Sequence, residues 1–448
     1  MTRPNRSLRK SGLWLASGLI GFSAAAQAAP SPNAAVEVGK ARAISGIEAA
    51  QLLIQSNHFI DARRVLDSLE KSTPNDNEVQ FLQAMLDVNA KLYSSAIHRF
   101  RGILVRDPKA VRVRLELART FYLAKDYDNA ERQFRFARAG NLPDPVTQNI
   151  DHYVAAIRGA RRFTYNFSVA LAPDTNINVG PTTTTVGLYG LPFTLSPDAR
   201  QRSGVGINVS AGGEWSPRIS KIVRGRIGVQ VNTTDYRTSS VDDSTVSAYA
   251  GPRILTGRWE ISPLLSGFNR WYGNRFYNRG LGGNLQTIYY PNAKTGLSAT
   301  VGAQEVTFAA PAGQGGLAIS GSLGFFRILS PASVLSGAVS MARQNAGLSV
   351  YANTVEQVRA GLDRDLTHGI TISVQPSYAR INYDAAQAAF GVPRRDRQVQ
   401  MQVSILNRRI DLYGFTPRLA YTFTHNASNI SLYAYDRSQV HMGLTRAF

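Results

Sequence analysis

The spacing of the hydrophobic positions changes partway along the chain and divides it into two parts. In the first part, apolar residues recur at intervals of three and four, which is the period of an amphipathic helix. In the second part they alternate with polar or small residues, as Phe163 and Tyr165 alternate with Thr164 and Asn166. This alternation predicts strands with one apolar face. The expected fold class is α + β multidomain, an α-helical domain followed by a β domain over residues 161–448.

A repeat of 34 residues runs through the helical part, over residues 43–142. Small, aromatic and proline residues recur in register: Ala50, Ala84 and Ala118; Phe59, Tyr93 and Tyr127; Ala62, Ala96 and Ala130; Leu66, Phe100 and Phe134; Pro74 and Pro108. Small residues suit the place where two helices cross closely, aromatic residues fill the space beside them, and proline ends the second helix. The spacing resembles the tetratricopeptide repeat. We therefore expect an N-terminal solenoid of three tetratricopeptide-like repeats.

The units are expected to stack, because one unit alone cannot bury its apolar face. A further amphipathic helix is predicted over residues 143–160, where it would connect the stack to the β domain. Two roles stay open for the solenoid: a concave surface that binds a peptide or partner, or a folding aid or plug. Six arginines make the third unit basic, either as a solvated face or as partner contacts: Arg112, Arg114, Arg119, Arg132, Arg135 and Arg138.

The β domain contains an even number of segments with strand character, as is typical of bacterial membrane barrels. They lie at about 163–171, 204–215, 222–233, 244–254, 258–272, 282–290, 295–308, 316–329, 333–342, 350–363, 370–382, 396–408, 412–424 and 435–448. Short turns such as Ser216–Lys221 alternate with longer loops such as Ala172–Ser203 and Tyr383–Arg395, as periplasmic turns alternate with extracellular loops. We therefore predict a transmembrane antiparallel β-barrel of about 14 strands. In the alternative, a soluble sandwich, the apolar face would form the core.

The end of the β domain supports a membrane location. The last segment places four apolar residues on one face, Val440, Met442, Leu444 and Phe448. A terminal aromatic residue in this pattern resembles the recognition signal of outer-membrane barrels, so outer-membrane lipid and the barrel assembly machinery are expected partners. Pro263 and Pro376 fall inside predicted strands, where a residue without an N–H group disrupts the ladder, and we expect a bulge at each.

The N-terminus has the features of a secretory signal peptide over residues 1–28. Arg3 and Lys10 belong to a basic start, an apolar run too short to span a bilayer follows, and Ala26-Gln27-Ala28 fits the small-x-small cleavage pattern. The chain has no cysteine, which excludes disulfides and thiolate metal sites. Its net charge of +20 raises the possibility of nucleic-acid binding, but arginines that line a lumen or face lipid head groups explain the charge better in an exported chain. We expect an outer-membrane location with the N-terminal domain in the periplasm, and no nucleic-acid partner.

No catalytic, cofactor or metal site is expected. A serine nucleophile needs a histidine base beside it. The predicted topology separates the histidines of the barrel, placing His368 in a periplasmic turn, His425 at an outer loop and His441 inward in the last strand. Neither a Gly-x-Ser-x-Gly elbow nor a P-loop or dinucleotide fingerprint occurs. We therefore predict that the protein is not an enzyme.

The order of these parts resembles the surface lipoprotein assembly modifier family, also called type eleven secretion translocons. The resemblance covers nearly the whole mature chain and includes a stretch after the first strand, Pro173-Asp174-Thr175-Asn176-Ile177-Asn178. It implies an outer-membrane protein that helps a protein cargo reach the cell surface or the medium. That cargo would be a surface lipoprotein or a soluble secreted protein, often linked to haem or metal-ion capture. Within the stretch, Asp174, Asn176 and Asn178 either brace a loop against the barrel wall or form local turns.

Several functions remain compatible with the sequence. In the first, a protein translocator, the periplasmic repeats capture an unfolded or partly folded cargo and the barrel conducts or templates its passage. The second is a polysaccharide-export porin, although three repeats would be few, and a lumen rich in acidic and aromatic residues would favour it. A general porin with an accessory repeat domain is a third, and a scaffold for an envelope complex a fourth.

Overall fold

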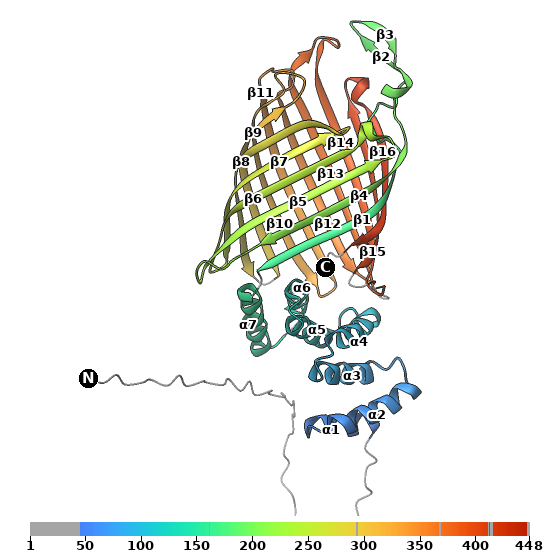
Figure 1. Cartoon of the computed structure of the whole chain (residues 1–448), viewed down its shortest axis with the longest axis vertical. Coiled ribbons are helices and arrows are strands. Elements are labelled where there is room, and N and C mark those ends of the chain that lie inside the picture. Colours follow the sequence, from blue (N-terminus) through green and yellow to red (C-terminus); the bar gives the residue numbers. More distant parts are fainter. Residues whose placement is uncertain are drawn as a thin grey trace, which may run out of the picture. The chain divides into compact units, whose positions relative to one another are not determined.

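The computed structural model describes residues 45–445, apart from residues 139, 141, 161, 293, 367, 368, 411, 413 and 414. The described part contains seven α-helices followed by a closed antiparallel β-barrel (Figure 1). This confirms the predicted fold class. The predicted signal peptide, His368 and the terminal Phe448 lie outside the described residues. Among the helices of the described part, none has the length and apolar character needed to cross a membrane.

Three helix pairs and a seventh helix form the N-terminal domain. Their bounds are α1 Gly46–Gln55, α2 Phe59–Ser72, α3 Asn77–Asn89, α4 Tyr93–Arg106, α5 Val111–Leu123, α6 Tyr127–Arg138 and α7 Asp144–Ala160. The second helix of each pair begins at Phe59, Tyr93 or Tyr127, so the 34-residue interval of the sequence is also an interval of the fold. Helix α7 occupies the residues where the connecting helix was predicted.

A residue in the left-handed conformation closes the turn inside each pair. Asn57, Lys91 and Lys125 have φ angles of 61°, 63° and 63°. This conformation costs a residue with a Cβ atom about 1–2 kcal/mol. It lets the turn hydrogen-bond back to the first helix, as when the Leu92 N–H donates to the Asp87 carbonyl oxygen at 2.8 Å. None of the three positions is a glycine, so the sequence pattern did not reveal this turn.

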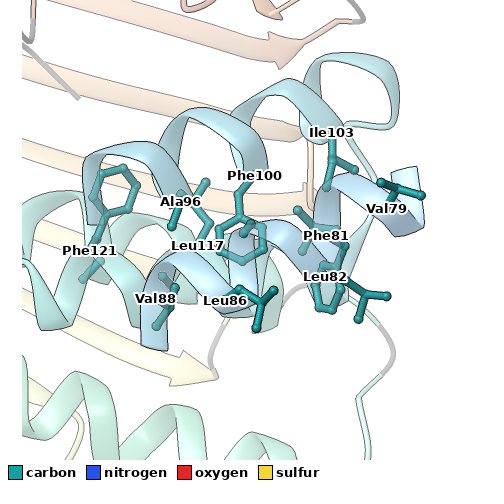
Figure 2. Packing of buried hydrophobic residues seen from close by; sticks show 14 of the residues in the cluster. Val79, Phe81, Leu82, Leu86, Val88, Ala96, Phe100, Ile103, Leu117 and Phe121 are labelled. Carbon is teal, nitrogen blue, oxygen red and sulfur yellow. The ribbon is translucent and has the colours of Figure 1, made fainter. Parts of the chain in front are cut away.

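The small and aromatic residues of the repeat form the core of the helical domain. The six alanines predicted at helix crossings are completely buried: Ala50, Ala62, Ala84, Ala96, Ala118 and Ala130. Side chains from α3, α4 and α5 meet in one layer (Figure 2), where the rings of Phe81 and Phe100 pack edge to face with their centroids 5.7 Å apart. Burying one side chain of this size stabilises the fold by about 1.5–3 kcal/mol.

A hydrogen-bonded carboxylate ties α2 to the next repeat. Glu70 accepts hydrogen bonds from Arg99 Nη1, Gln83 Nε2 and Gln80 Nε2, each at 2.8 Å. Burial acts to raise the pKa of Glu70, but these hydrogen bonds outweigh it and lower the pKa to about 2. The folded chain therefore favours the ionised form of this group more than the unfolded chain does.

The barrel consists of fourteen strands, in the order β1-β16-β15-β14-β13-β12-β11-β10-β9-β8-β7-β6-β5-β4. Their bounds are β1 Phe163–Asp174, β4 Gly204–Trp215, β5 Val223–Tyr236, β6 Asp243–Thr256, β7 Trp259–Tyr272, β8 Arg275–Asn292, β9 Thr295–Phe308, β10 Gly316–Ser330, β11 Ser333–Ala346, β12 Asn353–Asp365, β13 Ile370–Gln387, β14 Val392–Asn407, β15 Thr416–Ser428 and β16 Tyr435–Thr445. Neighbouring strands follow the sequence, and the first strand closes the sheet on the last. The connection between β1 and β4 carries a separate hairpin of β2 Thr185–Leu188 and β3 Leu191–Thr194 (Figure 1).

Large apolar side chains cover the outside of the barrel. Leu265, Leu281 and Leu323 are 62–64% exposed in the interior of their strands. Polar side chains from the alternate positions meet inside, as where Asn284 Nδ2 donates to Ser266 Oγ at 3.0 Å. A soluble sandwich would bury its apolar faces against each other, whereas a membrane barrel turns them toward lipid and keeps a polar interior. The exposed leucines therefore exclude the sandwich.

Two expectations about the strands were wrong. The predicted loop over Tyr383–Arg395 is a continued hairpin, because Ala386 pairs with Pro393 and Gln387 with Val392 beyond a bulge. Residues 275–281, which lie outside the sixth predicted segment, belong to β8, and residues 278–281 pair with both of its neighbours.

The bulges expected at Pro263 and Pro376 do not occur. Pro263 stays in register with Leu285 of β8, and Pro376 stays in register with Met401 of β14. Across the opposite neighbour of each proline the pairing is interrupted for a few residues and then resumes without a shift. A proline lacks only one donor, so it interrupts one ladder, and the paired strands on both sides hold its register.

The outward position of Leu323 predicts the effect of a charge on the barrel surface. Leu323→Arg should lower the free energy of unfolding in lipid vesicles by about 2–4 kcal/mol, because an arginine near the middle of the bilayer loses its hydration. Gln400→Arg, on the lumen side of β14, should change it by less than about 1 kcal/mol. Denaturant titrations followed by tryptophan fluorescence measure both values. Equal effects of the two variants would contradict the assignment of faces.

The lowered pKa of Glu70 predicts a pH-dependent contribution to helical stability. Above its ordinary pKa of about 4.3, Glu70 is ionised in both states and its full contribution is present; this is lost as the pH falls through the folded-state pKa of about 2. Because the side chain is 32% exposed, Glu70→Gln should cost only about 1 kcal/mol at pH 7. The difference from wild type should shrink between about pH 4 and pH 2. Thermal unfolding followed by circular dichroism at helical wavelengths checks this, with Glu48→Gln as a control in the first helix.

Candidate functional site

Two groups of side chains draw together residues that are far apart in the sequence. One group surrounds the Pro173–Asn178 stretch at the end of β1. The other lies where the third helix pair contacts the turns and strand ends of the barrel, and we call this end of the barrel its mouth. Both groups contain residues that the sequence singled out, and the second also contains residues that it did not.

Asp174 is the centre of the first group. Its carboxylate is fully buried and forms an ion pair with Arg437 of β16, Oδ2 to Nη2 at 2.6 Å. The same carboxylate accepts hydrogen bonds from Gln439 Nε2 at 3.0 Å and from the Tyr236 hydroxyl at 3.1 Å. Arg437 and Gln439 come from one neighbouring strand, and Tyr236 from β5 on the other side. Asp174 therefore fastens the end of β1 to both sides of the barrel wall.

The two asparagines hold the loop that follows. Asn176 is fully buried; its Nδ2 donates to the carbonyl oxygens of Gly180 at 2.8 Å and Asp436 at 3.1 Å. The Asn178 Nδ2 donates to the carbonyl oxygen of Arg200 at 2.6 Å. The Asn176 N–H also donates to Asp174 Oδ1 at 2.8 Å, which makes a local turn. The two alternatives left open for these residues, a brace and a local turn, thus occur together.

The apolar members of the stretch pack at the same place. Ile177 is buried in a small cluster with Tyr236 and Val241. Pro173 lies within β1 and is in register with Val205 of β4. The stretch therefore fixes the start of the β1–β4 connection by packing as well as by hydrogen bonds.

Arg114 of α5 connects the helical domain to the barrel mouth. Its side chain is buried and donates to Gln133 Oε1 at 2.9 Å and to the Pro108 carbonyl oxygen at 2.8 Å. It also forms an ion pair with Asp365 at the end of β12, Nη2 to Oδ2 at 3.4 Å. Burial lowers the pKa of Arg114, and Asp365 opposes this shift. The carboxylate of Asp365 faces a second cation, Arg408, at 3.5 Å.

Phe136 of α6 makes an apolar contact at the same junction. It is buried against Ile328 of β10 and Val334 of β11. The guanidinium groups of Arg114 and Arg132 lie over its ring, 5.3 Å and 5.5 Å from the centroid. An aromatic ring that lies under two guanidinium groups and also packs on barrel residues is a specific contact rather than a solvated surface. The sequence could not indicate it, because residues 136 and 328 belong to different periodic patterns.

Several arginines of the basic third repeat form ion pairs with carboxylates of the same chain. Arg135 forms an ion pair with Glu131 at 2.7 Å; burial acts to lower the pKa of Arg135, and Glu131 reverses this and raises it. Arg119 pairs with Glu116, and Arg138 with Asp151. Neither alternative from the sequence, a solvated face or partner contacts, describes these arginines fully, because several of them pair within the chain.

Inward positions of the barrel carry amides, small residues and a few ion pairs. Five glutamines from three neighbouring strands share this interior: Gln357, Gln375, Gln398, Gln400 and Gln402. Elsewhere in the barrel, Glu214 accepts hydrogen bonds from Arg226 Nε and Arg253 Nη2, each at 2.9 Å. Arg253 also forms an ion pair with Glu260 at 3.1 Å, so two carboxylates balance the charges of these two arginines.

The described histidines do not form a catalytic group. The expectation that His425 lies at an outer loop was wrong, because it is in register with Asp436 inside the β15–β16 ladder, with Nδ1 at a hydrogen-bond distance of 2.6 Å from Asp436 Oδ1. His441 lies within β16, in register with Ala420. Within the described ranges, no three or more histidine, cysteine, aspartate or glutamate side chains are grouped as a metal site requires.

The buried pair of Asp174 and Arg437 predicts a destabilising substitution. Asp174→Asn should lower the free energy of unfolding by about 3 kcal/mol, because it leaves the guanidinium of Arg437 buried without its counter-charge. The β1–β4 connection should also become more sensitive to protease, since Asp174 anchors its start. Adding Arg437→Gln to this variant should recover part of the loss. Asp198→Asn, in the same connection with a side chain 90% exposed, is the control and should leave both measurements unchanged.

Comparison with known proteins identifies relatives along most of the chain. Residues 163–448 match the family described as "Surface lipoprotein assembly modifier". The surface lipoprotein assembly modifier of Pasteurella multocida is 21% identical over 420 residues, covering 88% of this chain and 81% of the relative. That of Moraxella catarrhalis is 24% identical over 427 residues, covering 88% and 78%. The hemophilin secretion modulator of Acinetobacter baumannii is 21% identical over 424 residues, covering 90% and 85%.

Solved structures with a similar course of the chain include an anion-selective porin from Comamonas acidovorans. It is 10% identical, covers 64% of this chain and 100% of the porin, and has a TM-score of 0.34. A TM-score of this size supports no conclusion about function. A closed barrel with a lipid-facing exterior is the form in which β-sheet proteins span an outer membrane. From the family match, which includes the Asp174 and Asn176 brace and all fourteen strands, the chain belongs to the surface lipoprotein assembly modifier family.

Proposed function

We propose that this protein delivers a protein cargo across the outer membrane, with its helical repeats in the periplasm. The observation that carries the proposal is the buried contact between the third repeat and the barrel mouth, Arg114 on Asp365 and Phe136 on Ile328. A helical surface held in this way brings any polypeptide bound to the repeats to the barrel entrance. Solenoids of this kind commonly bind extended peptides. The relatives named as assembly or secretion modulators support a role in protein delivery.

The remaining partners follow from the same proposal. The cargo would be a surface lipoprotein or a secreted soluble protein. The names of two relatives, a surface lipoprotein assembly modifier and a hemophilin secretion modulator, give one example of each class. Outer-membrane lipid contacts the outward leucines, and the barrel assembly machinery inserts the barrel. We propose no enzymatic step, because delivery of a folded or unfolded chain needs binding and a path rather than bond cleavage.

A polysaccharide-export porin is the second class of function considered. A sugar path favours acidic and aromatic side chains along the lumen, whereas glutamines and small residues line β12 to β14. The carboxylate of Glu214, inside the barrel, is already bound by arginines. The Tyr249 hydroxyl donates to this carboxylate at 2.6 Å, and the Tyr435 hydroxyl accepts from Gln398 Nε2 at 3.0 Å, so these acidic and aromatic groups of the lumen are bound to other side chains.

Deleting the gene tests the proposed delivery. Surface proteins of intact cells and proteins of the medium would be compared with wild type by protease shaving and mass spectrometry. Loss of at least one lipoprotein or secreted protein from its external location, with retention inside the envelope, is the expected result. Unchanged external proteins in the deletion strain, together with a large and steady ion conductance of the purified barrel, would favour the porin instead.

The junction predicts a specific loss of delivery. Asp365→Ala removes the carboxylate that faces Arg114 and Arg408, so the repeats should no longer dock firmly and cargo display should fall at least fivefold. Asp384→Ala is the matched control, since it removes a carboxylate that pairs with Arg343, away from the junction. Flow cytometry of labelled cargo on intact cells measures display, and immunoblots of outer membranes confirm equal barrel levels. Equal display in the two variants would contradict a role for the junction.

A further inference from the structure

A chamber of about 1000 Å³ lies between the third repeat and the barrel mouth. Tyr127, Arg132 and Phe136 of α6 line it on the helical side, and Phe326 and Ile328 of β10 line it on the barrel side. Its volume is at the upper end of the range of about 300–1,000 Å³ found for ligand pockets. It is therefore large enough for several side chains of a peptide, and nothing in the proposed function assigns it.

The chamber is open to the rim of the barrel. Four consecutive residues at the start of β1 line it, Phe163, Thr164, Tyr165 and Asn166. Successive strand residues point to opposite faces of a sheet, so the chamber reaches both the lipid side and the lumen side of this strand. A ligand could enter from the rim and still contact inward residues such as Ile328, without separation of the two domains.

The cationic groups of the chamber differ in how far they are neutralised. Arg135 is paired with Glu131, as described above. For Arg132, the described residues include no hydrogen-bond acceptor or ion-pair partner; its guanidinium lies over the ring of Phe136 at 5.5 Å. The N–H donors of the Arg132 guanidinium are therefore available to a ligand.

The surroundings of Arg132 make an added anion favourable. Burial, followed by repulsion from Arg408, lowers the pKa of Arg132 to about 9, and Asp365 and Asp363 only partly oppose this. Arg408 itself has a buried Nη2 atom without a hydrogen-bond partner. Arg114 and Arg408 both form ion pairs with the carboxylate of Asp365, so this group is shared between two cations before its effect on Arg132 is counted. A carboxylate brought in by a ligand would relieve this excess of positive charge.

We propose that this chamber binds an extended polypeptide segment that combines carboxylate and apolar side chains, with Arg132 as the anchor for a carboxylate. Phe136, Phe326 and Ile328 provide apolar surface beside that anchor, and Asn166 provides an amide within reach of a peptide backbone. The inference rests on the proposed function and names the part of a cargo that the entrance selects. A small anion would satisfy Arg132 but leave the apolar walls uncovered, which is why a peptide fits the chamber better.

Binding of two matched peptides to the purified full-length chain in detergent tests the proposal. The first is a fluorescein-labelled ten-residue peptide of alternating glutamate and leucine, and the second has glutamine in place of each glutamate. The acidic peptide should bind at least tenfold more tightly, as measured by fluorescence anisotropy. Arg132→Gln should remove this preference, and Arg132→Lys should keep part of it. Arg64→Gln, whose side chain is 77% exposed in the first repeat, should leave it unchanged.

The location of binding is tested separately, and the absence of cysteine from the chain makes this direct. A single cysteine at Ser94, which lines the chamber, should be protected from maleimide by the acidic peptide. A cysteine at Ser68 on the exposed side of α2 should not be protected. Circular dichroism and heat-dependent migration of the barrel verify that each variant is folded.

Three results would overturn the proposal. The first is equal affinity for the acidic and the neutral peptide, and the second is an equal loss of affinity in Arg64→Gln and Arg132→Gln. The third is displacement of the peptide by phosphatidylglycerol micelles at lower concentration than by unlabelled peptide, which would assign the chamber to a lipid. Because the assay measures binding in detergent, it can fail while cargo delivery in cells is intact, and the two proposals are therefore tested independently.

Discussion

The need to satisfy every backbone hydrogen bond inside a bilayer determines the architecture of this chain. In lipid no water is available for an exposed N–H or C=O group, so a sheet is stable only when its first strand pairs with its last. Here β1 pairs with both β4 and β16, and all fourteen strands belong to one closed sheet. The alternation of apolar and polar residues is a consequence of this closure, since one face of each strand must contact lipid and the other the lumen. The two strand prolines are compatible with this closure, because each lacks a donor on one side only and the ladders around it hold the register.

The helical domain solves a different problem. Its units are stabilised by packing, and each buries the two alanines at which its helices cross. What joins it to the barrel is a mixed contact, with Phe136 on an apolar pair and Arg114 on Asp365. Breaking such a contact exposes both an aromatic ring and buried charges, so the third repeat and the mouth form a unit in spite of their different folds. This is the physical basis for regarding the third repeat as part of the barrel mouth rather than as a separate domain on a linker.

Periodicity predicted the elements of this protein well because both periods extend over many turns or strands. The 34-residue interval located the second helices at Phe59, Tyr93 and Tyr127, and the two-residue interval located fourteen strands. Local rules failed where long-range pairing overrides them, as at Pro263, Pro376 and the hairpin around Gln387. The Asp174 stretch was visible as a motif, but its partners Arg437 and Tyr236 belong to strands without any distinguishing pattern. The contacts at the barrel mouth could not be predicted for the same reason, since Phe136 and Ile328 are brought together only by the docking of two domains.

With the repeats in the periplasm, as we propose, the brace around Asp174 lies at the end of the barrel that faces away from the cell. At the end of the barrel that carries the β2–β3 hairpin, the other connections are short; the longest spans residues 309–315. The segment from 175 to 203 is thus the main relief on that face, and Asp174 and Asn176 hold its base in one shape. In that orientation, an antibody or phage would meet one segment anchored at its base on this face rather than a set of long loops. Tyr189 and Leu191 at the hairpin tip are exposed, so the tip is the part of this segment that such a molecule would contact.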